Sequence, residues 1–165
     1  MDVRTVIEYP TATPDQVFAL LVDRDFRSAV CVATHALEYD VDITHHDDGH
    51  VSVTVERTLP AEVPDFVKRF VGRTLSIVQS ERWGPHPSAG GRTADLLIQI
   101  KGQPATMKGS LRLEASGEGT REQVSGELTV SVPFVGKKIE PEVAKAIVAA
   151  AAQEQATGRA WLRGS

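Results

Sequence analysis

The sequence has one cysteine, few aromatic residues and no long hydrophobic run. A single cysteine, Cys31, excludes an intramolecular disulfide and fits a reducing compartment. It stands in the apolar stretch 29–33, where a free cysteine usually serves as a buried packing residue. No apolar run approaches the ~20 residues that a helix needs to cross a bilayer, and residues 1–4 do not open a signal peptide. We therefore expect a soluble, cytoplasmic protein without a transmembrane segment.

Concentrated positive charge and the common catalytic motifs are also missing. Lysines and arginines are scattered over a chain of net charge −4, with no basic stripe carrying interleaved aromatics. This excludes a typical nucleic-acid surface. The chain holds no glycine-rich phosphate loop after a strand, no His-Glu-x-x-His, no cysteine pair and no Gly-x-Ser-x-Gly elbow. We expect no nucleic-acid partner, cofactor or metal site, and we assign no catalytic residue.

The periodicity of the apolar residues is what the sequence does offer. The 165 residues suit a single domain spanning 1–165, large enough to bury a core without disulfides. Thr13 and Gln16 predict a capping box, and Pro141 is expected in the first turn of a long C-terminal helix. Short links between strands favour antiparallel neighbours. Alternation and helical spacing predict strands at 4–9, 37–44, 51–56, 75–83, 92–101, 107–115 and 123–132, and helices at 14–22, 26–34, 65–71 and 141–162.

The stretch Thr44–His50 reads THHDDGH and connects two of these strands. Both strands carry their apolar side chains at odd positions, so Ile43 and Val53 share a face only if the loop has an odd number of residues. A loop at 47–49, with Gly49 in the left-handed conformation, meets that condition. The pattern therefore predicts a three-residue hairpin loop.

This hairpin decides what the three histidines do. It places His46 opposite His50 on the polar face and points His45 the other way, so the side chains do not converge. A solvated turn is the favoured interpretation. The alternative is a weak divalent-metal contact through His46 and His50, without a third ligand of fixed geometry.

The order strand, two short helices, six antiparallel strands, long helix resembles the START-related superfamily. That superfamily includes polyketide cyclases, aromatase/cyclases and birch-pollen-allergen-like proteins. The segments YPTATPDQVFALLVDRDF and PFVGKKIEPEVAKAIVAAAAQEQ are similar to an uncharacterised bacterial family within it. The resemblance implies an α+β helix-grip fold, in which a strongly curved antiparallel sheet of about seven strands wraps around the C-terminal helix. It also implies an apolar ligand held between sheet and helix, with the 60–73 segment near the mouth.

The residues give a separate reason to expect a cavity. Ala146, Ala150 and Gly158 put small side chains on one stripe of the helix, and aromatics, at 5% of the chain, are too few to fill the space. Alternatively, an alanine-rich helix packs tightly and leaves no space. The candidate cavity residues are Tyr39, Val41, Val53, Val55, Arg57, Phe66, Phe70, Ile77, Gln79, Glu81, Leu96, Ile98, Leu111, Leu128, Val143, Ala146, Ile147, Ala150 and Glu154.

Some of these candidates are polar and are expected to point inward. Arg57 and Glu81 either form an internal ion pair or lie at strand ends in water, because a buried charge without a partner is costly. Functionally, Arg57 would hold a ligand carboxylate. A desolvated Glu81 would have a raised pKa and serve as a general acid or base.

Three functions of different classes remain open from the sequence. The first is binding or carriage of an apolar, lipid-like small molecule in the cavity. The second is an enzyme of the cyclase or dehydratase type, in which Glu81, Tyr39 or Arg57 acts in the same cavity. The third is a protein-interaction module with a filled core. Helix 65–71 is either a lid or ordinary packing, and the oligomeric state stays open.

Overall fold

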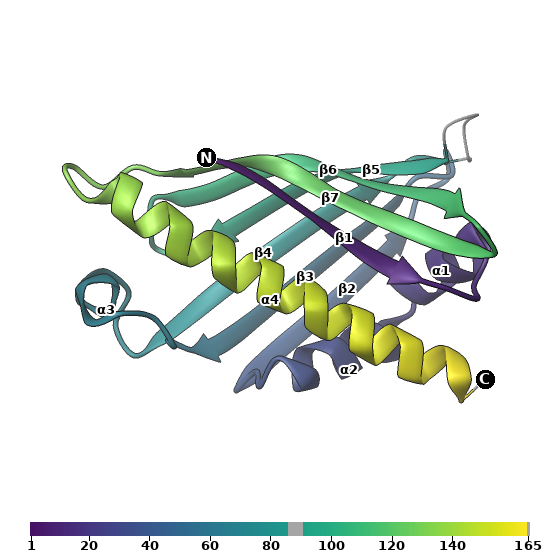
Figure 1. The fold of residues 1–165 in the computed structure, drawn as a ribbon, viewed down its shortest axis with the longest axis horizontal. Helices are drawn as coiled ribbons and strands as arrows, with labels where there is room; N and C mark the ends of the chain where they lie inside the picture. The colour runs from purple at the N-terminus through teal and green to yellow at the C-terminus, as the bar shows by residue number, and fades with distance from the viewer. Residues whose placement is uncertain (86–90, 165) are drawn as a thin grey trace.

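The computed structural model describes residues 1–85 and 91–164. It confirms the predicted α+β fold, in which a curved antiparallel sheet carries a long C-terminal helix across one face (Figure 1). The turn expected at 84–91 lies partly outside the described residues. The elements are β1 Asp2–Tyr9, α1 Pro14–Leu21, α2 Arg24–Ala33, β2 Glu38–His45, β3 Val51–Pro60, α3 Asp65–Val71, β4 Thr74–Trp83, β5 Arg92–Ile100, β6 Ala105–Ser116, β7 Gly119–Val130 and α4 Gly136–Arg163.

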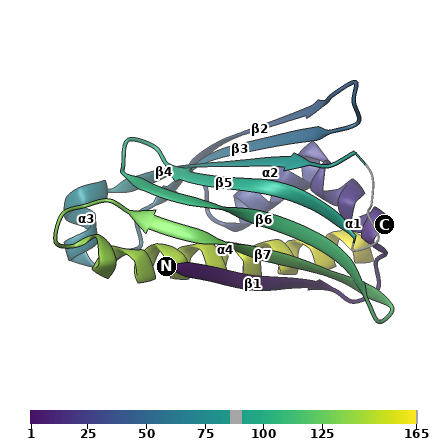
Figure 2. The same cartoon turned by 90° about the horizontal axis from the view of Figure 1, so that it is seen from above.

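The sheet has the strand order β1-β7-β6-β5-β4-β3-β2. Strands β2 to β7 follow one another as antiparallel neighbours, and β1 joins the far edge beside β7. Helix α4 runs diagonally across the strands, with α3 beside its N-terminal end, as Figures 1 and 2 both show. Helices α1 and α2 lie toward the other end of α4. The inner face of the sheet and α4 therefore enclose the interior of the molecule.

Local sequence signals set the beginnings of the first two helices. The Thr13 hydroxyl accepts a hydrogen bond from the Gln16 N–H, and the Gln16 side chain accepts one from the Thr13 N–H at 2.8 Å. The predicted capping box is confirmed. Helix α2 begins at Arg24, two residues before the predicted start, because the Asp23 carboxylate caps it by accepting from the Phe26 N–H.

The predicted hairpin is confirmed. Ile43 pairs with Val53, and the His46 N–H donates to the His50 carbonyl at 2.9 Å, leaving 47–49 as the loop. Gly49 has φ of 89°, the left-handed conformation that the parity argument requires. The odd-numbered positions of the apolar residues in both strands were therefore enough to predict the length of this loop.

The start of α4 corrects a prediction. Pro141 was expected in the first turn, but the helix begins five residues earlier, at Gly136, and Pro141 lies inside it. Close packing explains why the helix starts with a glycine, because a Cβ on Gly136 would lie 2.1 Å from the Val130 carbonyl oxygen. The early turn is therefore pressed directly against the end of β7.

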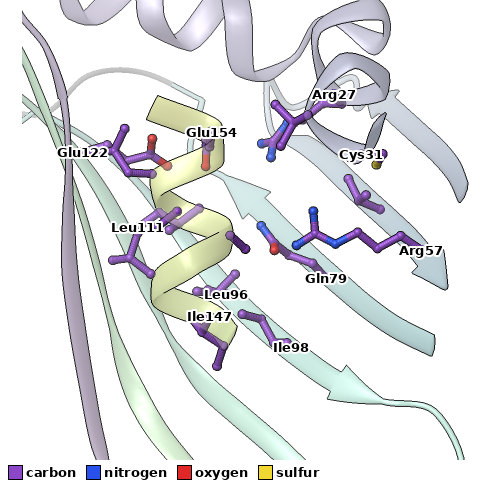
Figure 3. A pocket seen from close by; sticks show the side chains of 16 residues that line it. Arg27, Cys31, Arg57, Gln79, Leu96, Ile98, Leu111, Glu122, Ile147 and Glu154 are labelled. Carbon is purple, nitrogen blue, oxygen red and sulfur yellow. The ribbon is translucent and has the colours of Figure 1, made fainter. Parts of the chain in front are cut away.

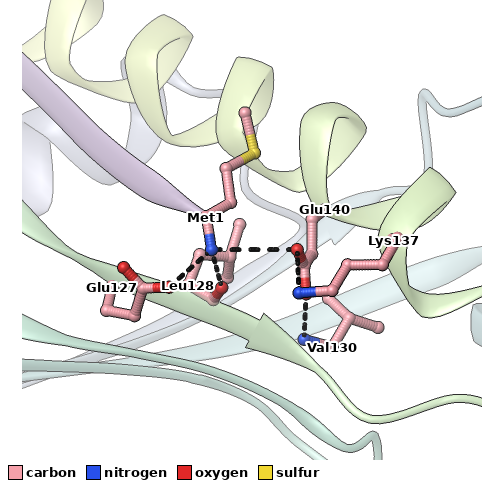
Figure 4. A network of polar contacts seen from close by, with 6 residues as sticks. All are labelled: Met1, Glu127, Leu128, Val130, Lys137 and Glu140. Atoms are coloured by element: carbon pink, nitrogen blue, oxygen red, sulfur yellow. Dashed lines mark hydrogen bonds and ion pairs between the residues drawn. The ribbon is translucent and has the colours of Figure 1, made fainter.

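Glu140 supplies the electrostatic reason for this extra turn (Figure 4). Its side chain is 3% exposed, and its Oε2 accepts from the Val130 N–H at 3.1 Å. Its Oε1 lies 3.8 Å from the Met1 ammonium and 3.5 Å from Lys137 Nζ. These contacts join the start of α4 to β7 and to the N-terminus, and they hold the pKa of Glu140 below its usual value, mainly through the Val130 hydrogen bond.

Strand β7 also differs from its predicted bounds. It begins at Gly119 and ends at Val130, so that Val132, expected inside the strand, follows it. The turn from β6 is tighter than expected because Gly117, with φ of 61°, reverses the chain within two residues. The lone Cys31 is fully buried in the main core, as predicted.

Candidate functional site

Two cavities lie between α4 and the inner face of the sheet. They share a wall formed by Arg57, Gln79, Ile98, Ile147 and Ala150. The first, of about 60 Å³, is called the polar cavity; its other lining residues are Ile7, Arg27, Val30, Cys31, Val55, Leu96, Leu111, Glu122, Val124, Ala151 and Glu154. The second, of about 80 Å³, is called the apolar cavity; its other lining residues are Leu59, Val63, Val67, Phe70, Val71, Leu75, Ile77, Ile100, Gln103, Pro104, Ala105, Val130, Val132, Ile139, Glu142, Val143 and Ala146.

Arg27 of α2 forms the buried ion pair of the polar cavity. Its Nη2 donates to Glu81 Oε1 at 2.5 Å, and its Nε donates to the Leu21 carbonyl at 2.7 Å. Both alternatives considered for Arg57 and Glu81 are wrong, since the two do not pair with each other and both are buried rather than at strand ends in water. On the adjacent strands β3 and β4, Glu81 lies opposite Val53, and Arg57 is four residues further along β3. That separation is about 13 Å along the strand, too far for an ion pair.

Glu81 is held by further donors besides Arg27. Trp83 Nε1 donates to its Oε1 at 2.9 Å and Gln79 Nε2 to its Oε2 at 2.6 Å. The Glu81 side chain is 1% exposed, so the Arg27 charge and these donors compensate the loss of water around the carboxylate. Both oxygens of Glu81 are thus engaged by protein groups rather than presented to the cavity.

Two further carboxyl groups of the polar cavity, those of Glu122 on β7 and Glu154 on α4, lie close to each other (Figure 3). Burial raises the pKa of Glu122 well above its ordinary value, and the charges of Glu154 and Glu81 raise it further. Burial also raises the pKa of Glu154, although the Arg27 charge opposes this. Glu122 Oε2 is buried and has no hydrogen-bond partner among the described residues. The pair therefore retains a proton at pH values where exposed carboxyl groups are ionised.

Tyr9 of β1 closes this end of the polar cluster. Its ring is fully buried, and its hydroxyl donates to Glu154 Oε1 at 3.4 Å. Burial raises the pKa of Tyr9, and the nearby Glu154 charge adds to the effect. The hydroxyl is thus a neutral donor at this carboxyl pair.

Arg57 of β3 lies in the wall between the two cavities and is 8% exposed. Figure 3 shows its guanidinium directed toward Gln79 and the space beside α4. No carboxylate in residues 1–85 and 91–164 forms an ion pair with it. The Cys31 thiol, a weak acceptor, is a neighbour of Arg57 in the polar cavity and interacts with its guanidinium. Burial lowers the pKa of Arg57, and its interactions with the Cys31 thiol and with Glu154 oppose this.

The apolar cavity is covered on one side by α3. Val67 is buried, and Phe70 and Val71 also line the cavity. Val143 and Ala146 of α4 line the same cavity. Hydrophobic side chains form nearly all of this wall, so the space favours an apolar guest.

The sequence-based candidates divide into two groups. Tyr39 is 44% exposed and lines neither cavity, because β2 is an edge strand that has a neighbour only on the β3 side. Phe66 is also exposed outside both cavities. Val41, Val53, Glu81 and Leu128 are buried but line neither cavity. The candidates that line a cavity are Val55, Arg57, Phe70, Ile77, Gln79, Leu96, Ile98, Leu111, Val143, Ala146, Ile147, Ala150 and Glu154.

The histidine-rich hairpin, which lies wholly within the described residues, does not form a metal site. Within the described residues, no group of three or more His, Cys, Asp and Glu side chains is arranged to hold a metal ion. At the hairpin, His46 Nε2 lies 2.8 Å from Ser52 Oγ, and His50 Nδ1 lies 3.1 Å from Asp48 Oδ1. The two imidazoles thus contact separate partners. No helix in residues 1–85 and 91–164 is long and apolar enough to cross a membrane.

Solved structures with the same fold come from several sources. TTHA0849 from Thermus thermophilus is 15% identical over 100% of both chains, with a TM-score of 0.65. Ara h 8.0201 is 15% identical over 94% of this chain and 95% of that chain, with a TM-score of 0.56. Ms6760 from Mycobacterium smegmatis is 11% identical over 99% of this chain and 91% of that chain, with a TM-score of 0.55. At these identities the likeness shows the fold alone.

At the level of sequence, the chain matches a protein family but no curated protein. The match to a family covers residues 5–162, which include every strand but the start of β1 and nearly all of α4. The chain therefore belongs to the family described as "Protein of unknown function (DUF2505)".

Proposed function

We propose that the protein binds a small apolar molecule between α4 and the curved sheet. The observation that carries the proposal is the apolar cavity, whose wall is almost entirely hydrophobic although it lies beside a cluster of buried charges. A cavity lined by apolar groups with a few polar groups at one end is the usual form of a small-molecule site.

The cavity volumes limit the size of the guest. Each cavity is smaller than the ~150 Å³ of an engineered protein cavity that binds benzene. Even a single aromatic ring must therefore span the shared wall or displace α3, whose Phe70 and Val71 line the apolar cavity. This gives α3 the role of a lid for larger ligands.

The fold and the lone cysteine support a superfamily and a cellular compartment for this function. The likeness to Ara h 8.0201 supports placing the chain in the START-related, birch-pollen-allergen-like superfamily. Cys31 is fully buried and unpaired, which supports a reducing, cytoplasmic setting.

An acid–base enzyme is the second candidate function, and one observation favours it. Glu122 and Glu154 line the polar cavity, and burial raises the pKa of both. They would take the role that the sequence predicted for Glu81, whose oxygens are already engaged. A reaction of the cyclase or dehydratase type needs such a proton-holding group next to its substrate. Product formation from a recovered ligand, lost in Glu122→Gln while binding persists, is the expected result.

The binding function is tested by filling the cavities. Ala150 lines both cavities, whereas its neighbour Ala149 is exposed on the same helix. We expect Ala150→Leu to weaken binding of the neutral fluorescent probe N-phenyl-1-naphthylamine by about tenfold or more, which is ~1.4 kcal/mol. Ala149→Leu is the matched control and leaves the affinity unchanged. A fluorescence titration measures both.

Two results would contradict the proposal. One is the absence of saturable binding and of any rise in melting temperature across a panel of neutral apolar probes. The other is equal probe affinity in Ala150→Leu and Ala149→Leu, which would place the binding site away from the cavities.

A further inference from the structure

Arg57 is a buried charge that has no counter-ion among the described residues. Arg27, the other arginine of the polar cavity, has the Glu81 carboxylate at 2.5 Å and the Leu21 carbonyl at 2.7 Å. Arg57 is 8% exposed, and its neighbour in the polar cavity is the Cys31 thiol, which is no counter-ion. Leaving a buried guanidinium without an anion costs free energy that the fold must compensate elsewhere. A buried arginine without a counter-ion is explained if the ligand brings the anion that pairs with it.

The surroundings of Arg57 define where that anion would lie. Arg57 and Gln79 stand in the wall that the two cavities share, and Ile98, Ile147 and Ala150 complete it. A group bound to the guanidinium there has the apolar cavity directly beside it. The Gln79 amide donates a hydrogen bond to Glu81, and this bond holds the Gln79 side chain at the shared wall.

The charges around the site select the kind of anion. Glu154 and Arg27 both act on Arg57 electrostatically, and Glu122 and Glu81 lie in the same cluster. Arg27 is committed to Glu81, so Arg57 is, among the described residues, the one cationic group in the shared wall left to bind a ligand. A single guanidinium matches a monoanionic carboxylate through two parallel hydrogen bonds. A doubly charged phosphate would meet the acidic groups with only one cation to balance it.

We propose that the ligand is an amphipathic carboxylic acid, whose carboxylate pairs with Arg57 while its hydrocarbon part occupies the apolar cavity. This inference rests on the proposed function and adds the chemical class of the ligand to it. The Arg57 side chain thereby sets the orientation of the ligand, with the acid group at the shared wall and the chain toward α3. Alcohols of equal length lack the charge and gain only the apolar contacts.

The test compares acids with alcohols of matched chain length. Calorimetric titrations use hexanoate, octanoate and decanoate against hexanol, octanol and decanol at neutral pH. We expect at least one acid to bind about tenfold more tightly than its alcohol, since a charge-assisted pair is stronger than a neutral contact. Arg57→Met removes this preference and Arg57→Lys retains part of it. Arg4→Met, at an exposed position of β1, is the matched control and changes nothing.

The outcomes separate this inference from the proposed function. Equal affinity for acid and alcohol, with no effect of Arg57→Met on either, overturns the carboxylate assignment and leaves the apolar site standing. Failure of every acid and alcohol to bind, together with failure of the neutral fluorescent probe, overturns both. The acid–alcohol contrast in the unmodified protein decides the matter even if Arg57→Met does not fold.

Discussion

At the scale of single residues, the interior of this protein depends on how its buried charges are paired. Arg27 neutralises Glu81, and Trp83 and Gln79 supply the remaining donors. Removing one partner of such a pair leaves an uncompensated charge in a site closed to water. The consequence is a strong dependence of stability on a residue of α2 that lies far from Glu81 in the sequence.

This dependence gives a stability prediction. Arg27→Met should lower the free energy of unfolding by about 3–5 kcal/mol, because it removes the cation that is paired with the buried Glu81 carboxylate. Arg24→Met, an exposed position on the same helix, is the control and should change stability by less than about 0.5 kcal/mol. Chemical denaturation followed by circular dichroism measures both. Equal midpoints for the two variants would show that Glu81 does not need Arg27.

The carboxyl pair gives a prediction about pH. The pKa of Glu122 is raised in the folded protein above its ordinary value of 4.5, so the folded state binds more protons than the unfolded state above that pH. Stability contributed by the protonated group is therefore lost as pH rises from 4.5 through the raised pKa. Glu122→Gln removes this loss and keeps a donor toward Glu154. We expect the melting temperature of the variant, relative to the parent, to rise with pH.

The measurement is a series of thermal melts from about pH 4 to about pH 8. Glu118→Gln, at an exposed position in the turn before β7, should follow the parent at every pH. Parallel curves for Glu122→Gln and the parent would mean that Glu122 titrates normally in the folded protein.

The residue scale is also where the sequence predicted least. Glu154 was predicted to face the cavity because it lies on the apolar stripe of the C-terminal helix, and it does line the polar cavity. Arg27, Glu122 and Tyr9 were missed, since each meets its partner through contacts between elements far apart in the chain. The available signals were the position of Arg27 on the same helical face as Cys31 and the even position of Glu122 in step with Val124. Neither signal says which charges meet.

At the scale of elements, the alternation of apolar and polar residues and the capping residues predicted the strands and the start of α1 best. The parity of the apolar positions fixed the hairpin at 47–49, and capping residues fixed the start of α1, because both depend on neighbours in the chain. The start of α4 could not be read in the same way. It depends on Gly136 fitting against Val130 and on Glu140 bonding across to β7, and both are contacts with another strand.

The packing of α4 on β1 gives an element-scale prediction. A Cβ on Gly158 would lie 2.5 Å from Tyr9 Cε1, and the Tyr9 ring is fully buried. Gly158→Ala gains about 1 kcal/mol in helix propensity but must displace this ring. We expect net destabilisation by about 1–3 kcal/mol in thermal or chemical unfolding. Gly164→Ala, where the nearest atom would be 3.6 Å away, is the control and should not destabilise. A more stable Gly158→Ala would show that the ring has room to move.

At the scale of the whole molecule, the resemblance and the small helix residues together predicted the cavity region. Ala146 and Ala150 do line the space between helix and sheet. The division into a polar and an apolar part was not predicted, because it follows from where α2 brings Arg27 and β7 brings Glu122. Residues of both kinds were visible in the sequence, but their distribution along the cavity needed the assembled fold.

The position of β1 beside β7 has a consequence for how the chain reaches its native state. The Arg159 Nε donates to the Glu8 carbonyl across 151 positions of sequence, and all of β1 pairs with the penultimate element. Contacts of such long range are slow to form, since the intervening polypeptide must first be brought together. During synthesis β1 cannot take its place in the sheet until β7 and α4 have left the ribosome, so this edge of the sheet forms after the other strands have been made.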